Sequence, residues 1–295
     1  MIVEELTTCP VCGGGAFTPY ITCQDHLVSQ QPFQIQRCEQ CQLLFTNPRP
    51  TPDTIGSYYK SDAYISHDDT RQGLMDTVYR MVRSYTLQEK EKLIRRLAGR
   101  VGAMLDYGCG TGAFLAQCQE KGWTITGYEP DPDARRLAEQ RTQTTVLKDL
   151  NDIQAVASLD VITLWHVLEH VPDLHSTLAR LASSLRSGGA LVIAVPNPES
   201  VDAKQYETNW AAYDVPRHLY HFTPKVLKAL LGKHGLTLEQ QLPMRFDAYY
   251  IAMLSTQHRD GKTNYLESLQ QGWRSNASAS RTGNYSSLTY VFRKP

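Results

Sequence analysis

The chain has 295 residues, enough for one large α/β domain with a small appendage or for two ordinary domains. Hydrophobic residues make up 41% and charged residues 20%, which argues against a disordered or fibrous chain, and 30 basic residues balance 30 acidic ones, so the overall charge offers no attraction to nucleic acid or anionic lipid. No apolar run approaches the length of a bilayer span, and the first residues lack the pattern of a signal peptide, so we expect a soluble, cytoplasmic protein without a membrane partner.

Residues 1–52 are predicted to form a zinc ribbon. Four cysteines occur as two Cys-x-x-Cys pairs, Cys9 with Cys12 and Cys38 with Cys41. Two such pairs complete a tetrahedron around one zinc ion, and a site with four cysteine ligands is closed and structural. The odd total of seven cysteines argues against a disulfide framework. A metal-free ribbon is the alternative.

The ribbon should contain short strands at residues 16–23, 33–37 and 43–45, with Cys23 as a strand residue rather than a fifth ligand. Residues 1–60 contain five acidic and three basic side chains, a balance that repels phosphates. We therefore expect the ribbon to pack against the larger domain as a lid and not to bind nucleic acid.

Residues 53–100 are interpreted as a connector with N-terminal helices that could form a lid. The stretch 53–73 is irregular and carries Tyr58, Tyr59 and Tyr64. From 74 to 97, apolar residues recur at helical spacing, which predicts a helix or helix pair with one buried face.

From residue 101 to 295, short apolar strands alternate with helices, which predicts an α/β fold with a doubly wound, mostly parallel, seven-stranded sheet. The expected strands are 101–106, 124–129, 144–147, 159–164, 190–195, 236–242 and 288–293. The expected helices are 113–121, 132–141, 175–185 and 224–235, with one or two more between 248 and 273 and a mobile loop at 275–287.

A glycine-rich loop follows the first of these strands. Asp106, Gly108, Gly110 and Gly112 lie between a strand and a helix, where glycines let a ligand approach the backbone beside a helix N-terminus. Glu129 ends the next strand, where a carboxylate can accept both hydroxyls of a ribose. Because the loop also satisfies the dinucleotide pattern, an NAD-type oxidoreductase is an alternative. Asp106, however, suits a positively charged ligand better than a pyrophosphate.

These motifs, in this order, resemble those of class I S-adenosylmethionine-dependent methyltransferases over about residues 75–295. The resemblance implies a Rossmann-like fold, S-adenosylmethionine as cofactor and methyltransferase activity. It also implies the residues that contact the cofactor: Asp106, Gly108, Gly110 and Gly112 with the methionine moiety; Glu129 and Pro130 with the ribose; Asp149 and Leu150 with adenine; Trp165 and His166 lining the pocket.

Residues 213–222 should lie over the carboxyl edge of the sheet, where ligands bind in open parallel sheets. His218 and His221 are candidate general bases, Tyr220 is a further catalytic candidate, and Arg217 could hold an anionic group of the substrate. The alternative is a hydrogen-bonded structural loop.

Spacings of three and four residues would place His166, Glu169 and His170 on one helical face, a geometry that can also bind a metal. No further ligand is evident, so His166 is interpreted as lying near the cofactor and Glu169 and His170 as structural.

Taken together, the sequence predicts in-line methyl transfer to an O, N or C atom of a small molecule such as a sugar, lipid precursor or secondary metabolite. An RNA methyltransferase guided by the ribbon is an alternative, which the acidic ribbon disfavours. A zinc protein without activity is a third reading, which Asp106 and Glu129 argue against. The acceptor and the oligomeric state are not predicted.

Overall fold

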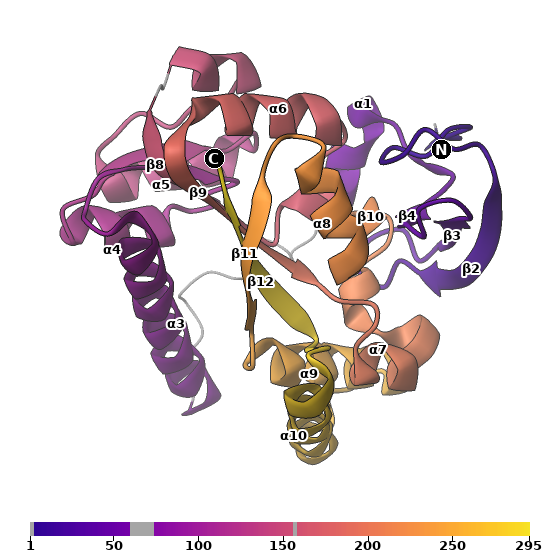
Figure 1. Cartoon of the computed structure of the whole chain (residues 1–295). Helices are drawn as coiled ribbons and strands as arrows, with labels where there is room; N and C mark the ends of the chain where they lie inside the picture. Colours follow the sequence, from indigo (N-terminus) through magenta and orange to yellow (C-terminus); the bar gives the residue numbers. More distant parts are fainter. Residues whose placement is uncertain (1–2, 60–73, 156–157) are drawn as a thin grey trace.

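A computed structural model describes residues 3–59, 74–155 and 158–295, and its centre is a six-stranded sheet (Figure 1). The strand order is β11-β12-β9-β8-β6-β7, in which β9, β8, β6 and β7 pair in parallel and β12 pairs antiparallel with both β9 and β11. The strands are β6 (Ala103–Tyr107), β7 (Thr124–Tyr128), β8 (Leu159–Trp165), β9 (Leu185–Pro196), β11 (Thr237–Pro243) and β12 (Ser287–Arg293). The doubly wound, mostly parallel fold is thereby confirmed.

Helices cover both faces of this sheet, and β9 explains why. Leu191, Ile193 and Val195 join the core beneath α6 and α8, whereas Ala190 and Val192 join the core beneath α3, α4 and α5. Successive side chains of a strand point to opposite faces of the sheet, so a strand that is apolar on both faces must be covered on both sides. The helices are α3 (Leu74–Ala98), α4 (Ala113–Glu120), α5 (Pro132–Thr142), α6 (Leu174–Ser184), α8 (Pro224–Gly232), α9 (Asp247–Asp260) and α10 (Tyr265–Thr282).

Two sequence-based expectations are wrong. Residues 144–147 do not form a seventh strand: Leu147 makes a single parallel bridge to Tyr128, donating to the Gly127 carbonyl (2.8 Å) and accepting from the Glu129 amide (2.9 Å), and its neighbours do not extend the pairing. Most of the expected mobile loop at 275–287 is the end of α10, which packs on α9 and buries Ser275 and Ala279.

The N-terminal ribbon forms a second sheet with the order β10-β4-β3-β2, beside a small β1-β5 pair. Its strands are β1 (Val3–Glu4), β2 (Phe17–Gln24), β3 (Pro32–Cys38), β4 (Leu44–Thr46), β5 (Arg49–Pro50) and β10 (Tyr220–His221). Cys23 is a buried residue of β2, as expected. β10 lies within residues 213–222, the segment predicted to contact substrate, so the larger domain contributes the edge strand of the ribbon sheet (Figure 1).

The short elements connect these layers. They are α1 (Pro52–Ile55), α7 (Val201–Tyr206) and the 3-10 turns η1 (Gly56–Tyr59), η2 (Leu150–Ala155), η3 (Leu168–His170), η4 (Glu207–Asn209) and η5 (Ala211–Tyr213). The single helix α3 confirms the helical prediction for 74–97, while Tyr64 lies outside the described residues. Within the described ranges, no helix has both the length and the apolar character needed to cross a bilayer.

Candidate functional site

The loop between β6 and α4 is the segment that the sequence predicts to cradle a cofactor. Gly108, Gly110 and Gly112 all have positive φ, at 76°, 54° and 74°. A Cβ at Gly108 would lie 2.6 Å from the Val167 side chain, so a glycine is required where the loops after β6 and β8 meet. A Cβ at Gly110 would meet none of the described atoms within 4 Å. The backbone at Gly110 is therefore open to a ligand beside the α4 N-terminus.

Glu129 follows β7 and its carboxylate is fixed by two backbone amides. Its Oε2 accepts from Gly110 N (2.8 Å) and its Oε1 from Asp131 N (3.0 Å). Burial raises the pKa of Glu129, against the lowering effect of these two bonds. The neighbouring Pro130 carbonyl accepts from Arg135 Nη1 (3.0 Å). The Gly110–Glu129 bond thus brings the glycine loop and the predicted ribose-binding acid together, as the sequence predicts for adjacent parallel strands.

Asp106 is buried near the end of β6, with Oδ1 accepting from the Thr163 hydroxyl (2.6 Å). Burial raises the pKa of Asp106 to about 7, although Thr163 and the Lys90 ammonium lower it. Lys90 projects from α3, with Nζ 4.2 Å from the centroid of the Trp165 ring. Burial in turn lowers the pKa of Lys90. Asp106 therefore lies in a place that favours a cationic partner.

His166 directly follows β8 and has a positive φ of 56°. Its Nε2 lies 3.0 Å from an oxygen of Asp247, the first residue of α9, and its Nδ1 lies 3.5 Å from Glu169 Oε1. Burial alone would lower the pKa of His166, but Asp247 and Glu169 raise it to about 9. His166 is therefore a cation at neutral pH. Acidic and basic side chains alternate here. Lys90 interacts electrostatically with Asp106 and Asp247, and His166 interacts with Asp247 and Glu169.

The predicted adenine-contacting residues lie further along the same edge. Asp149 is exposed, and its Oδ1 accepts from Asn151 N (2.7 Å) at the start of η2, which begins at Leu150. Asp149 thus caps a turn that follows the bridge between Leu147 and the end of β7.

Residues 213–222 cover a small pocket. Its polar lining includes Glu169, His218 and His221, and its apolar lining includes Pro196, Trp210 and Phe222. His218 Nδ1 lies 2.9 Å from the Ala212 carbonyl, and since a carbonyl accepts, Nδ1 carries the proton and Nε2 the lone pair. His221 Nε2 lies 3.5 Å from Thr46 Oγ1 of β4. Burial and the nearby His218 lower the pKa of His221 well below its usual value.

Two polar side chains of this segment are engaged internally. Arg217 is buried and donates to Asp25 (3.0 Å) and to Asp214 (2.6 Å), so it does not hold a substrate anion as the sequence suggests. The Tyr220 hydroxyl donates to the Pro172 carbonyl (2.9 Å) and accepts from Arg49 Nη1 (2.9 Å). Arg217 and Tyr220 therefore fix residues 213–222 against the ribbon and the turn at Pro172.

Sequence reasoning missed Lys90 and Asp247, and it did not connect Glu169 and His170 with His218. Lys90 has a readable signal, because it interrupts the buried apolar stripe of α3 that includes Ile94 and Leu97. The contacts of Asp247 with His166 and of His218 with Glu169 and His170 join segments far apart in the chain, so no local sequence pattern indicates them.

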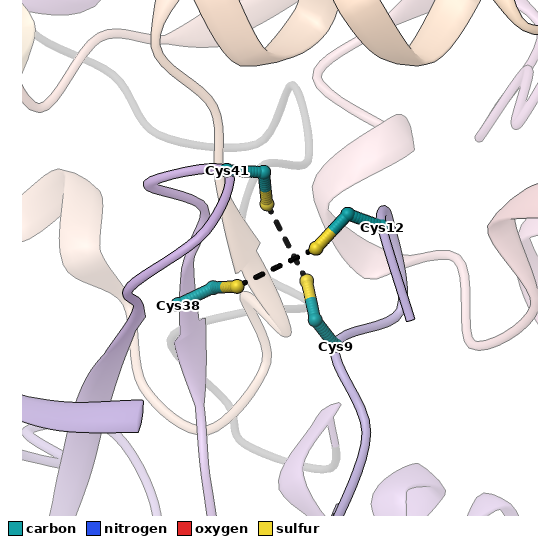
Figure 2. Close-up of side chains that lie close together, drawn as sticks. All are labelled: Cys9, Cys12, Cys38 and Cys41. Atoms are coloured by element: carbon teal, nitrogen blue, oxygen red, sulfur yellow. Dashed lines mark hydrogen bonds between the residues drawn. The ribbon is translucent and has the colours of Figure 1, made fainter. Parts of the chain in front are cut away.

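Figure 2 shows the sulfur atoms of Cys9, Cys12, Cys38 and Cys41 pointing toward one another. All four lie within 4.8 Å, with Cys9 3.5 Å from Cys41 and Cys12 3.5 Å from Cys38. Zinc–sulfur bonds of about 2.3 Å would separate the sulfurs of a tetrahedron by about 3.8 Å. The Gly14 amide also donates to Cys12 Sγ (3.4 Å), which suits a thiolate. These four residues fit a closed tetrahedral zinc site, with no position left for a substrate.

The fold and the cradle define a Rossmann-like, S-adenosylmethionine-dependent methyltransferase. The family described as "Methyltransferase domain" matches residues 82–241, more than half of the chain, and the chain belongs to this family. The NAD-type alternative is thereby overturned.

Known relatives agree with this assignment. A ubiquinone biosynthesis O-methyltransferase from Xanthomonas axonopodis pv. citri is 27% identical over 176 residues, covering 54% of this chain and 72% of the relative. A malonyl-[acyl-carrier protein] O-methyltransferase from Serratia marcescens is 30% identical over 125 residues, which cover 41% of this chain and 48% of the relative. In fold, the chain is similar to a magnesium protoporphyrin IX methyltransferase from Synechocystis PCC 6803 solved with bound SAH. The two chains are 14% identical with a TM-score of 0.55, and the match covers 83% of this chain and 100% of the other.

Proposed function

We propose that this enzyme methylates an oxygen atom of a small molecule. The observation that carries the proposal is the position of the pocket lined by Glu169 and His218, one loop away from the cofactor cradle. The lining of the pocket, as far as the described residues form it, is mostly apolar and includes no Lys or Arg, a composition that favours a small organic acceptor over a nucleic acid. The relatives named above as O-methyltransferases support oxygen as the acceptor atom. Seven cysteines without a disulfide support a reducing, cytoplasmic setting.

The cradle would hold the cofactor through Asp106, the backbone at Gly108–Gly112 and Glu129, with Asp149, Leu150, Trp165 and His166 along the same edge. Bound S-adenosylmethionine supplies an electrophilic methyl group whose bond to sulfur breaks with its electrons retained by sulfur. The protein's task is to align the acceptor oxygen behind that methyl and to exclude water.

His218 is proposed to take the hydroxyl proton as the new carbon–oxygen bond forms. Its Nε2 lone pair is available because Nδ1 donates to the Ala212 carbonyl. His221 and Tyr220 are proposed to shape the pocket: the imidazole of His221 is neutral and deeply buried, and the Tyr220 hydroxyl already has two partners. Zinc at the four cysteines is proposed to be structural.

The proposal is tested by incubating the enzyme with methyl-labelled S-adenosylmethionine and panels of hydroxylated, amino and carbon-acid small molecules. We expect label on an oxygen atom. His218→Gln should lower kcat by about 10²- to 10⁴-fold, the usual contribution of a general base, with cofactor affinity unchanged. His234→Gln, which alters a surface histidine pair with His175, is the matched control and should keep full activity. Label on nitrogen, carbon or RNA, or full activity of His218→Gln, would contradict the proposal.

A further inference from the structure

Glu169, His170 and His218 form a cluster that the cofactor cradle does not use. One ligating atom from each of the three side chains lies within 4.8 Å of the others. The two imidazole rings meet edge to face, with centroids 4.6 Å apart. The cluster is held by the backbone, because Leu219 N donates to the Glu169 carbonyl (2.8 Å). The segment that carries His218 is thereby fixed beside η3.

Both imidazoles present a lone pair on the same ring atom. His170 Nδ1 lies 3.0 Å from the Arg217 carbonyl, and His218 Nδ1 lies 2.9 Å from the Ala212 carbonyl. A carbonyl oxygen can only accept a hydrogen bond, so each Nδ1 carries the proton. In the neutral rings, each Nε2 then has the lone pair that can bind a metal ion. The Tyr59 hydroxyl, 2.9 Å from His170 Nδ1, is then placed to accept from the same N–H. Backbone carbonyls commonly orient metal-binding histidines in this way.

The Glu169 carboxylate points to a missing partner. Its side chain is only 1% exposed, and among the described residues neither oxygen takes part in a hydrogen bond. The nearest cation, His166 Nδ1, lies 3.5 Å from Oε1, which leaves Oε2 without any charged neighbour at bonding distance. A buried carboxylate whose charge is faced by one imidazolium and whose oxygens accept no hydrogen bond among the described residues has room for a further cationic ligand.

We propose that Glu169, His170 and His218 bind a divalent first-row transition-metal ion, separate from the four-cysteine site. Two neutral imidazoles and one carboxylate favour such an ion over Mg²⁺ or Ca²⁺, which take oxygen ligands, and a three-ligand set leaves coordination positions open. Glu169 and His218 also line the small pocket described above, which therefore adjoins the cluster. The sequence-based reading of Glu169 and His170 as structural lacked the third ligand, which the fold supplies from nearly fifty residues away.

The role of this ion rests on the proposed function. An acceptor hydroxyl that enters the pocket would bind an open position of the ion, which lowers the hydroxyl pKa and releases its proton to water. Because the His218 lone pair then binds the ion, the ion takes the place of the general base proposed above and stabilises the negative charge on the acceptor oxygen. An acceptor with two adjacent oxygens would fill two open positions, so we infer that vicinal diols, catechols or hydroxy acids are the preferred class.

The test is a titration of zinc-loaded enzyme with Co²⁺, followed by visible absorption and by metal analysis. We expect one Co²⁺ per chain, with zinc retained and no cobalt–thiolate absorption, since the four cysteines stay occupied. Glu169→Gln and His218→Gln should each weaken Co²⁺ binding by about a hundredfold or more, because even outer partners of metal ligands contribute 10- to 100-fold. His234→Gln should leave it unchanged.

Several outcomes would overturn the metal site: no Co²⁺ beyond the zinc, binding unaffected by Glu169→Gln, or binding lost in His234→Gln. Zinc content and cofactor affinity report whether each variant is folded, and Glu169→Gln preserves side-chain shape should His218→Gln fail to fold. An enzyme that methylates oxygen but binds no Co²⁺ would refute the metal and leave the proposed function standing. An enzyme that binds Co²⁺ but methylates only nitrogen or carbon would refute the proposed function and leave the metal site standing.

Discussion

At the scale of single residues, burial raises the pKa of both acids beside the glycine loop, but their hydrogen bonds differ. Glu129 accepts two backbone amides, which favour its charged form. Asp106 receives one hydroxyl and is otherwise buried, and burial raises its pKa to about 7. Asp106 therefore titrates near neutral pH, and a cationic ligand shifts it toward the charged form.

This difference predicts a pH dependence of cofactor affinity. Between pH 6 and pH 8, the ionised fraction of a carboxyl with a pKa of about 7 rises about tenfold, so affinity for S-adenosylmethionine should rise by a similar factor. Calorimetric titrations at pH 6, 7 and 8 would measure it. In Asp106→Asn, affinity should fall at least about tenfold at pH 8 and lose most of the pH dependence. A variant that keeps the same pH profile would assign the titration to another group, such as the amine of the cofactor.

At the scale of elements, the pair of His166 and Asp247 links the end of β8 to the start of α9. The folded-state pKa of His166, about 9, lies above its ordinary value of 6.5. The pair therefore contributes its full stability below about pH 6.5, and this contribution is lost as the pH rises through about 9. About a third of the His166 side chain is exposed (34%), so solvent screening reduces the contribution to about 1–2 kcal/mol.

Asp247→Asn should therefore lower the free energy of unfolding by about 1–2 kcal/mol at pH 6 and by almost nothing at pH 10. Urea denaturation of both proteins at pH 6, 8 and 10 measures the difference. Asp260→Asn, at the far end of α9, is the control, because its partner Arg259 does not titrate in this range and its effect should not vary with pH. A difference that grows with pH would show that His166 is not the titrating partner.

Local patterns predicted most of the elements and the cofactor motif, because periodicity and capping act over a few residues. The Pro-initiated helices α5 and α8 begin where expected, whereas β9 begins five residues before the expected strand at 190–195. The end of α10 was not predictable from its serine-rich sequence, since it is stabilised by tertiary contacts such as Ser275 Oγ to Asp202 (2.8 Å). The same limit applies to the site: motif spacing predicted Asp106 and Glu129, whereas Lys90 and His218 reach their neighbours through the fold.

At the scale of the whole molecule, the ribbon packs against the segment that lines the pocket containing His218. Thr46 of β4 donates from its amide to Leu219 O (3.0 Å) and from its hydroxyl to His218 O (2.7 Å). Arg217 pairs with Asp25 of the ribbon, and Lys233 Nζ donates to the Val11 carbonyl (2.6 Å) between Cys9 and Cys12. We infer that metal at the four cysteines positions His218.

Loss of zinc should therefore impair catalysis more than cofactor binding. Cys41→Ser should lose zinc and lower kcat by about 10- to 100-fold, since a displacement of about 1 Å at a reacting group has an effect of that order. Affinity for S-adenosylmethionine should change by less than about threefold, because the cradle is built on β6, β7 and β8, away from the ribbon sheet.

Cys23→Ser is the matched control: it replaces a buried thiol of the same ribbon outside the zinc cluster and should retain both zinc and kcat. Metal analysis, calorimetry and initial rates on the same preparations supply the three readouts. An equal loss of cofactor affinity and kcat in Cys41→Ser would mean that zinc supports the whole fold, and unchanged kcat after zinc loss would separate the ribbon from the reaction. A selective loss of kcat is the result expected of a ribbon whose outermost strand, β10, lies next to His218 in the chain.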